Sequence, residues 1–326
     1  MRPLIAFDRS LAARAAIRTA AALFAPTEAV VVTVRRPPLE EDREILARLI
    51  LPEDLARRGM AEVERRIEED ARATVEEGVK LVGEHGMRAE GVLVAAARPW
   101  RVIAALATEH AADVVVCGAH GRAPLGGGFL GSTATSLLQC ARLPVLVIPP
   151  GFAHPSDAVI VGYDGSPAAK GALRFAAEHL PQRRALIAYA WCSPVRHEMQ
   201  LNLMHHLPPE VVREFVPAVD AVYGDAAEKI AREGVQAAEA LGMAAHARAI
   251  ESADSPWRAL LHLAARERAN VIVAGCACDG DTTSVLGSVR SGLVHHAPTA
   301  ILLVPELTTT ANGDPAEQPH AVALRG

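Results

Sequence analysis

The stretch VVVCGAHGRAPLGGGFLGSTATSLLQCARLPVLVIP, residues 114–149, has the pattern of a strand, a glycine-rich loop, a helix and a second strand. The apolar runs at its two ends are short and rich in Val, which is typical of strands buried on both faces. Ser132 and Thr133 begin the helical run that follows the glycines. Strands of this kind, separated by helices, indicate an α/β fold with a parallel sheet covered on both sides.

The chain repeats this pattern after about 156 residues. DRSLAARAAIR (8–18) aligns with DGSPAAKGALR (164–174), and LPVLVIPP (143–150) aligns with TAILLVPE (299–306). The offset between the aligned landmarks stays within one residue of 156 along the whole repeat, which indicates that a complete domain is duplicated.

We therefore predict one domain over residues 1–150 and a second over 157–306. The Pro, Gly and Ser residues between them are typical of a linker. Residues 307–326 lack an apolar period and are predicted to form a disordered tail. In each half, five short β-rich runs alternate with helical segments, so the fold class is α/β, with two doubly wound parallel sheets of about five strands each.

Length and composition place the chain among ordinary globular proteins. Its 326 residues are 50% apolar and 22% charged, which is enough Val, Leu and Ala to bury a core in each of two domains. The formal net charge of -5 provides no basic field for a polyanion. We therefore expect neither a nucleic-acid partner nor an anionic membrane partner.

Two further features bear on the compartment. No apolar run approaches the ~18 residues of a membrane helix, and the N-terminus reaches Asp8 before a signal-peptide core could form. The five cysteines are scattered and odd in number, so they form no disulfide framework. A cytoplasmic location is expected.

Ligands of open parallel sheets bind beyond the carboxyl ends of the strands, where helices on opposite faces leave a crevice. In the first half, this edge contains the glycine loop, in which G-x2-G-x9-G precedes a helix start. Glycines let backbone N–H groups approach a phosphate, and a helix N-terminus adds unpaired donors. A mobile surface turn would explain the glycines alone about equally well. The candidate binding residues are Asp8, Val34, Gly118, His120, Gly121, Arg122, Gly131, Ser132 and Thr133.

Two other nucleotide motifs do not fit. Gly126, Gly128 and Gly131 match G-x-G-x-x-G, but Gly126 lies eight positions after Gly118 at the end of the preceding strand, and no acidic residue lies at the required distance. The G-x-x-x-x-G-K-[ST] pattern of P-loop NTPases is absent from the sequence.

The sequence also predicts neither a metal centre nor a catalytic centre. Cys276 and Cys278 lack the usual C-x2-4-C spacing of zinc ligands, and His295 and His296 belong to a separate predicted helix. The glycine loop supplies no recognisable general base or arginine finger, so any hydrolysis of a nucleotide should be slow. His120 either contacts a phosphate or faces solvent.

The start DGSPAAKGALRFAAEHL (164–180), the 114–149 stretch and the tandem arrangement resemble universal stress proteins with two such domains. The resemblance covers about residues 1–306. It implies a flavodoxin-like sheet with strand order 3-2-1-4-5, and one subclass of the family binds ATP. On this resemblance Asp8 would lie near the nucleotide and the Val34 backbone would meet adenine. Gly118, Gly121, Gly131, Ser132 and Thr133 would hold the ribose and phosphates of ATP, with or without Mg²⁺.

The two halves depart differently from the family pattern. Arg9 stands where the family usually has Gly, and it either reaches a phosphate or is simply solvated. In the second half Cys278 replaces the glycine equivalent to Gly121, and Asp279 and Asp281 bring negative charge to the phosphate position. We therefore expect ATP in the first half only.

Three functions remain open at this point. The favoured one is an ATP-binding regulatory protein, not an enzyme. The alternative is an interaction module without nucleotide, in which residues 36–86 and 193–242 dock an unknown protein partner. An α/β enzyme acting on phosphorylated metabolites is least favoured, because no nucleophile–base pair can be placed.

The resemblance also implies how the halves assemble. Single-domain relatives form dimers through the fifth strand, and here PVLVIP and AILLVP are both apolar strands with edges to cover. We expect the two halves to form an intramolecular pseudo-dimer through these strands.

Overall fold

The computed structural model describes most of the chain. The described residues are 1–37, 53–121, 130–140, 142–152, 157–180, 183–193, 208–252, 255–276, 288–306 and 322–324.

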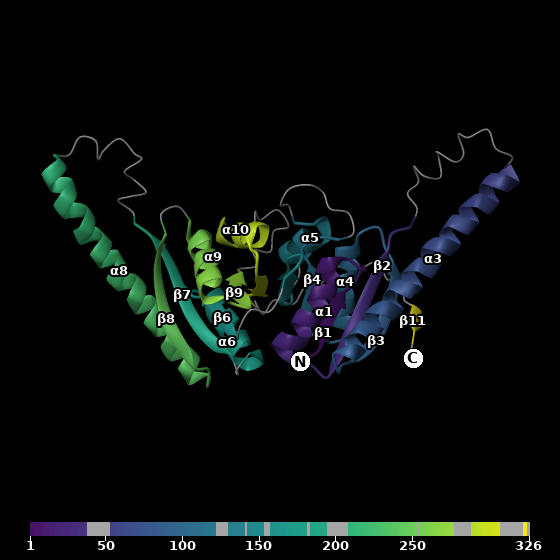
Figure 1. The fold of residues 1–326 in the computed structure, drawn as a ribbon, viewed down its shortest axis with the longest axis horizontal. Coiled ribbons are helices and arrows are strands. Elements are labelled where there is room, and N and C mark those ends of the chain that lie inside the picture. The colour runs from purple at the N-terminus through teal and green to yellow at the C-terminus, as the bar shows by residue number, and fades with distance from the viewer. Residues whose placement is uncertain are drawn as a thin grey trace.

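Strands and helices alternate through both halves, as predicted (Figure 1). The first half contains β1 (Pro3–Ala6), α1 (Leu11–Phe24), β2 (Glu28–Arg35), α3 (Glu53–Glu84), β3 (Arg88–Ala95), α4 (Pro99–Glu109), β4 (Val114–Gly118), α5 (Ser132–Cys140) and β5 (Val145–Ile148). The second contains β6 (Ala158–Gly162), α6 (Pro167–His179), β7 (Arg184–Cys192), α8 (Pro209–Ala240), β8 (Ala245–Ser252), α9 (Pro256–Glu267), β9 (Val271–Cys276), α10 (Ser288–His296) and β10 (Ala300–Pro305).

The strands of both halves form one continuous sheet in the order β11-β3-β2-β1-β4-β5-β10-β9-β6-β7-β8. Within each half the pairs are parallel and the order is 3-2-1-4-5, which confirms the predicted fold. The two halves join where β5 pairs with β10 in antiparallel orientation. This pairing confirms the expected pseudo-dimer through the fifth strands.

Three residues of the segment 307–326, which the sequence predicts to be disordered, form a strand. Val322–Leu324 form β11, which pairs antiparallel with β3. The outer edge of β3 would otherwise present unpaired backbone N–H and C=O groups, and β11 satisfies part of them. The rest of the predicted tail lies outside the described residues.

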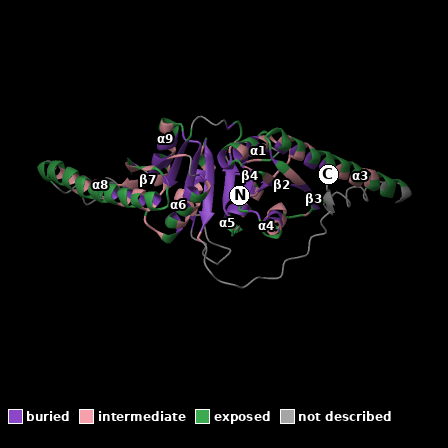
Figure 2. Cartoon of the chain, turned by 90° about the horizontal axis from the view of Figure 1, so that it is seen from below, coloured by how far each residue is buried: buried purple, intermediate pink, exposed green. Residues whose placement is uncertain are grey.

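Helices cover both faces of the sheet, and each face carries one hydrophobic core that runs through both halves (Figure 2). Because successive strand residues point to opposite faces, Ile5 belongs to one core and Leu4 to the other. The first core receives side chains from α1, α3, α6 and α8, and the second from α4, α5, α9 and α10.

The long helices α3 and α8 end in the same way. Gly86 and Gly242 follow them with φ values of 78° and 80°, and the next residue donates its N–H to a carbonyl five residues earlier. This is the Schellman arrangement, in which Gly avoids the cost of a left-handed conformation. Glycine therefore caps the C-terminus of the long helix in both halves.

Each long helix also approaches the sheet closely at one glycine. A Cβ atom on Gly78 would lie 2.7 Å from Val31 and 2.8 Å from Phe7. A Cβ atom on Gly234, the equivalent residue of α8, would lie 2.6 Å from Ile187 and 2.7 Å from Tyr163. The N-terminal parts of both helices extend beyond the sheet as diverging arms (Figure 1).

Candidate functional site

The end of β4 lies directly against the start of α1. A Cβ atom on Gly118 would be 2.7 Å from Cβ of Ala12 and 3.2 Å from the backbone nitrogen of Ala13. Only glycine permits this approach without a shift of the helix. The predicted glycine loop therefore begins beside the β1–α1 turn, at the carboxyl edge of the sheet.

Asp8 and Ser10 shape the β1–α1 turn. The Asp8 carboxylate accepts a hydrogen bond from the Ser10 N–H at 3.0 Å. The Ser10 hydroxyl oxygen accepts one from the Ala13 N–H at 3.0 Å, so Ser10 is the N-cap of α1. The same hydroxyl lies 3.4 Å from the carbonyl of His120, to which it donates. The turn is thus tied to the glycine loop.

Asp8 also faces Gly121 directly. A Cβ atom on Gly121 would be 2.9 Å from Oδ2 of Asp8. The lack of a side chain at this position is what lets the carboxylate lie along the loop. The structure therefore brings together Asp8, Gly118, His120 and Gly121, four of the residues that the sequence placed at one edge.

Gly131 closes the described part of the loop. Its N–H donates to the carbonyl of Ala119 at 2.8 Å, and its own carbonyl accepts from the Thr135 N–H at 3.0 Å. A Cβ atom on Gly131 would be 3.2 Å from the Ala119 oxygen. The first-turn N–H groups of α5, which begins at Ser132, have no acceptor within the helix. Thr133 is half-buried in that turn.

Three further candidates are placed less directly. Val34 lies in β2, the strand next to β1, and its half-buried side chain packs against the second core. The Nδ1 atom of His120 is buried and has no hydrogen-bond partner in the described part of the chain. Arg122 lies outside the described residues.

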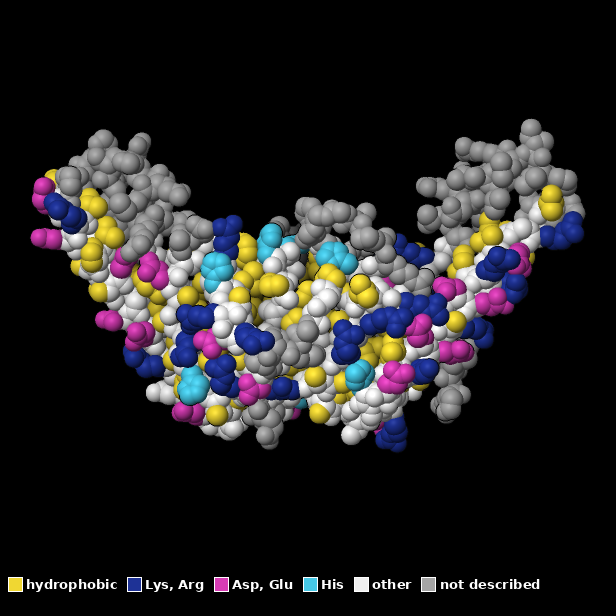
Figure 3. All heavy atoms as spheres, in the orientation of Figure 1, with side chains coloured by type: hydrophobic (Ala, Val, Ile, Leu, Met, Phe, Trp, Pro, Cys, Tyr) yellow, Lys and Arg dark blue, Asp and Glu magenta, His cyan; other side chains and the backbone are white. Residues whose placement is uncertain are grey.

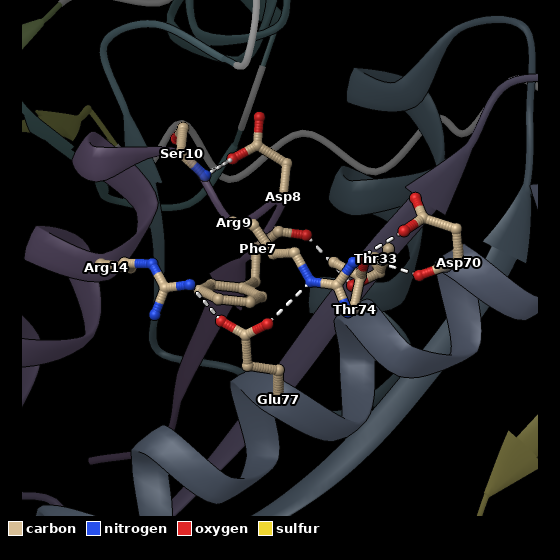
Figure 4. A network of polar contacts seen from close by, with 9 residues as sticks. All are labelled: Phe7, Asp8, Arg9, Ser10, Arg14, Thr33, Asp70, Thr74 and Glu77. Carbon is tan, nitrogen blue, oxygen red and sulfur yellow. Dashed lines mark hydrogen bonds and ion pairs between the residues drawn. The ribbon is translucent and has the colours of Figure 1, made fainter.

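Arg9 fulfils neither expectation from the sequence. It points away from the glycine loop toward α3, where its guanidinium binds Glu77 at 2.7 Å and Asp70 at 2.7 Å (Figure 4). Glu77 also binds Arg14 of α1. The φ angle of Arg9 is 66°, in the left-handed region that favours glycine. The Arg9 cluster, formed by Arg9, Arg14, Asp70 and Glu77, links α3 to the turn that holds Asp8.

The second half repeats the turn but not the cluster. Asp164 accepts from the Ser166 N–H at 2.9 Å, as Asp8 does from Ser10, and Gly165 replaces Arg9 with a φ of 80°. The offset of 156 places Ala226 where Asp70 stands in the first half. In the first half, Arg35 of β2 also forms an ion pair with Glu68 of α3 at 2.7 Å. At the equivalent positions of the second half, Trp191 lies beside Gly224.

The expectation that the second half does not bind ATP depends on four residues of its glycine loop. Cys278, Asp279, Asp281 and Gly287 lie outside the described residues. Gly275 of β9 is described, and a Cβ atom there would be only 2.2 Å from the Ala168 carbonyl oxygen. The close approach of a strand end to a helix start is therefore common to both halves.

Cys117 lies directly before Gly118 in β4 and is buried. Burial raises the pKa of its thiol to about 12, so the thiol is protonated at neutral pH. Cys117 therefore contributes to packing below the loop and not to a nucleophilic centre.

Sequence reasoning missed the polar side chains that hold the turn. Ser10 could have been found, because the D-x-S pattern recurs at 8–10 and 164–166 and Ser before a helical run is an N-cap signal. Asp70 and Glu77 gave no such signal, since their partner Arg9 is more than 60 residues away in the sequence.

Comparison with known proteins gives a consistent result. The model of the universal stress protein family matches residues 1–149 and 156–305. A universal stress protein of Mycobacterium tuberculosis is 34% identical to this chain, in a match that covers 29% of this chain and 39% of the relative. One from Mycolicibacterium smegmatis is 35% identical, with 36% and 41% covered. These matches therefore span less than half the length of the curated relatives.

Solved structures show likeness in fold. A universal stress protein from Archaeoglobus fulgidus has a TM-score of 0.62 at 16% identity, covering 94% of this chain and 98% of that one. A protein from Pseudomonas aeruginosa, described as a putative universal stress protein, has a TM-score of 0.51 at 11% identity, covering 93% and 92%. No helix among the described residues is long and apolar enough to cross a membrane.

Proposed function

The chain belongs to the universal stress protein family, and on that premise we propose that it is an ATP-binding regulatory protein whose nucleotide lies in the first half. The binding crevice would be bordered by the Asp8 turn, the end of β2 at Val34 and the loop from Gly118 to Thr133. The observation that carries this proposal is the approach of the Asp8 carboxylate to Gly121, because it sets an acceptor beside a loop position that has no side chain.

The polar groups at this edge suit different parts of a nucleotide. A carboxylate accepts hydrogen bonds from ribose hydroxyls and also coordinates Mg²⁺. The first-turn N–H groups of α5 suit phosphate oxygens, because they lack intrahelical acceptors and lie at the positive end of the helix dipole. The buried Nδ1 of His120 is a further group that a polar ligand would satisfy.

We propose binding with slow or no turnover. Glu77 and Asp70, two carboxylates near the turn, are directed at Arg9 (Figure 4). A carboxylate held by arginine is a poor general base, since its oxygens already accept hydrogen bonds from the guanidinium and are not free to take a proton from a water. The protein would then sense ATP and not consume it.

Titration calorimetry of the full chain with ATP and Mg²⁺ tests the proposal. We expect one ATP per chain. Gly131→Val should abolish binding, because a side chain there meets the Ala119 carbonyl and displaces the helix donors. Two lost charge-assisted hydrogen bonds at about 1.5–3 kcal/mol each would reduce affinity on the order of a hundredfold or more.

Gly287→Val is the matched control, since the offset of 156 makes Gly287 the equivalent of Gly131. Total binding should be nearly unchanged in this variant. A stoichiometry of two, or loss of binding only in the Gly287 variant, would show that the roles of the halves are wrongly assigned. Absence of ATP binding, together with no nucleotide in the purified protein by absorbance and mass spectrometry, would favour the interaction module instead.

A further inference from the structure

One face of α8 is apolar although it points away from the sheet. Val211, Phe215 and Val222 are 45%, 48% and 67% exposed, and Ala218 between them is also exposed. The helix continues through Pro217, and at 100° per residue these four side chains lie on one side of it. Ala227 and Ala231, on the opposite side, are buried against the sheet. We call Val211, Phe215, Ala218 and Val222 the outer stripe of α8.

The equivalent face of α3 shows that the fold does not require an apolar stripe. The offset of 156 places Leu55, Gly59, Glu62 and Arg66 at the matching positions. Glu62 binds Arg66 at 2.8 Å and Arg65 at 2.7 Å, as expected of a solvated helix face. In Figure 3 both arms carry charged side chains, and a run of hydrophobic side chains is visible along the α8 arm. The two arms have therefore diverged in surface chemistry.

The spacing of the outer stripe favours a helix as its partner. Its residues follow at intervals of four, three and four, which is the a/d pattern of a coiled coil. When two copies of this segment are set antiparallel about a two-fold axis, Phe215 faces Ala218 of the second copy. Val211 then faces Val222 of the second copy. In the Phe215–Ala218 pair a large side chain thus meets a small one, which suits knobs-into-holes packing.

The residues that flank the stripe agree with the same register. In this register, the residues next to the outer stripe also meet across the contact. Val212 lies near Val219 of the second copy, and Glu214 lies near Ala221 of the second copy. No like charges meet across these flanking pairs, so electrostatic repulsion does not oppose the contact. We propose that α8 pairs antiparallel with α8 of a second copy of this chain through the outer stripe.

The contact would be weak. Four side chains from each copy bury less than the roughly 1,200 Å² that stable protein interfaces need. The pairing should therefore depend on protein concentration, and two chains would dissociate on dilution.

Sedimentation equilibrium of the full chain over a wide concentration range tests the proposal. The average mass of the wild-type chain should rise from one chain toward two. Val222→Glu should weaken association by about tenfold or more, because it places an unpaired carboxylate in the apolar contact. Arg66→Glu, the matched change on α3, should leave association unchanged. Circular dichroism checks that each variant is folded.

Ala218→Phe separates a specific pairing from general stickiness. This substitution makes the stripe more apolar, but it sets Phe against Phe215 of the second copy, where the proposed register has no room. We expect weaker association than in the wild type. Association as strong as or stronger than wild type in Ala218→Phe, or a wild-type chain that stays at the mass of one copy at all concentrations, would overturn the proposal.

Discussion

Leu146 and Leu302 occupy the same position in the two repeats and pair with each other across the antiparallel β5–β10 ladder. On either side, Val145 pairs with Leu303 and Val147 pairs with Ile301. The pseudo-two-fold axis therefore passes through the Leu146–Leu302 pair. Because both leucines are fully buried, the covered fifth-strand edges are part of the protein core.

The first prediction concerns this pair. Leu146→Ala and Leu302→Ala should each lower the free energy of unfolding by about 2–5 kcal/mol, the usual cost of a buried Leu-to-Ala change. The loss in the double variant should be smaller than the sum of the two single losses, since the two side chains pair with each other in one hydrophobic cluster. Urea unfolding of all four proteins gives the coupling. Strict additivity would show that the two side chains do not interact.

A second prediction concerns the glycines under the long helices. Gly78→Ala should destabilise the protein by about 1–3 kcal/mol, because the new methyl group meets Val31 and Phe7 and forces α3 outward. Gly83→Ala is the matched control in the same helix, where no atom lies within 4 Å of the added carbon. It should stabilise the protein by up to about 1 kcal/mol through helix propensity. Denaturation midpoints that shift alike in both variants would contradict the close approach at Gly78.

Features that depend on local sequence pattern or on the repeat can be predicted from the sequence. The strand order places the ends of β1 and β4 side by side, so the meeting of Asp8 and Gly121 could be anticipated from topology alone. The C-caps at Gly86 and Gly242 follow from local backbone chemistry.

The partners of Arg9 could not be anticipated. They depend on where α3 crosses the sheet, and that is decided by the close approach at Gly78 and by long-range packing. The β11 strand is a similar case, because its three residues carry little signal and their pairing depends on the free edge of β3.

A third prediction uses the buried thiol of Cys117. With its pKa raised to about 12, Cys117 should resist iodoacetamide at pH 8, whereas the exposed Cys140 should react. Mass spectrometry of the alkylated chain measures both. The pKa of this thiol in the folded protein lies above the ordinary value of a cysteine, about 9, so stability is retained below pH 9 and falls as pH rises toward 12. Cys117→Ala should remove this part of the pH dependence. Rapid alkylation of Cys117 in the folded protein would contradict its burial.

A fourth prediction follows from the contact between Asp8 and Gly121. Gly121→Ala places a methyl carbon 2.9 Å from Oδ2 of Asp8, so the carboxylate must turn away from the loop. If the proposed ATP site is correct, the affinity should fall about tenfold or more, the effect of losing one hydrogen bond to a charged group. Gly171→Ala in α6, where the added carbon meets nothing within 4 Å, is the control. Equal calorimetric affinities for both variants would remove Asp8 from the site.

The last prediction separates backbone strain from ion pairing at Arg9. Arg9→Gly loses the contacts with Glu77 and Asp70 but relieves the left-handed backbone, whose cost for a residue with a Cβ atom is about 1–2 kcal/mol. The contacts are partly exposed, with 27% of the Arg9 side chain accessible, so each contributes about 1 kcal/mol or less. The two effects nearly cancel, and the stability of Arg9→Gly should stay close to that of the wild type.

Arg9→Ala loses the same contacts and keeps the strain, so it should be less stable than Arg9→Gly by about 1 kcal/mol. Gly165→Ala should show a similar loss in the second half, where φ is 80° and no arginine cluster exists among the described residues. Urea midpoints at low and high salt complete the comparison. Salt should make the wild type less stable than Arg9→Gly, because it screens the ion pairs while the backbone strain remains, and should leave the difference between Ala and Gly at position 9 unchanged. Equal midpoints for the Ala and Gly variants would mean that the turn adopts another conformation once the Arg9 cluster is broken.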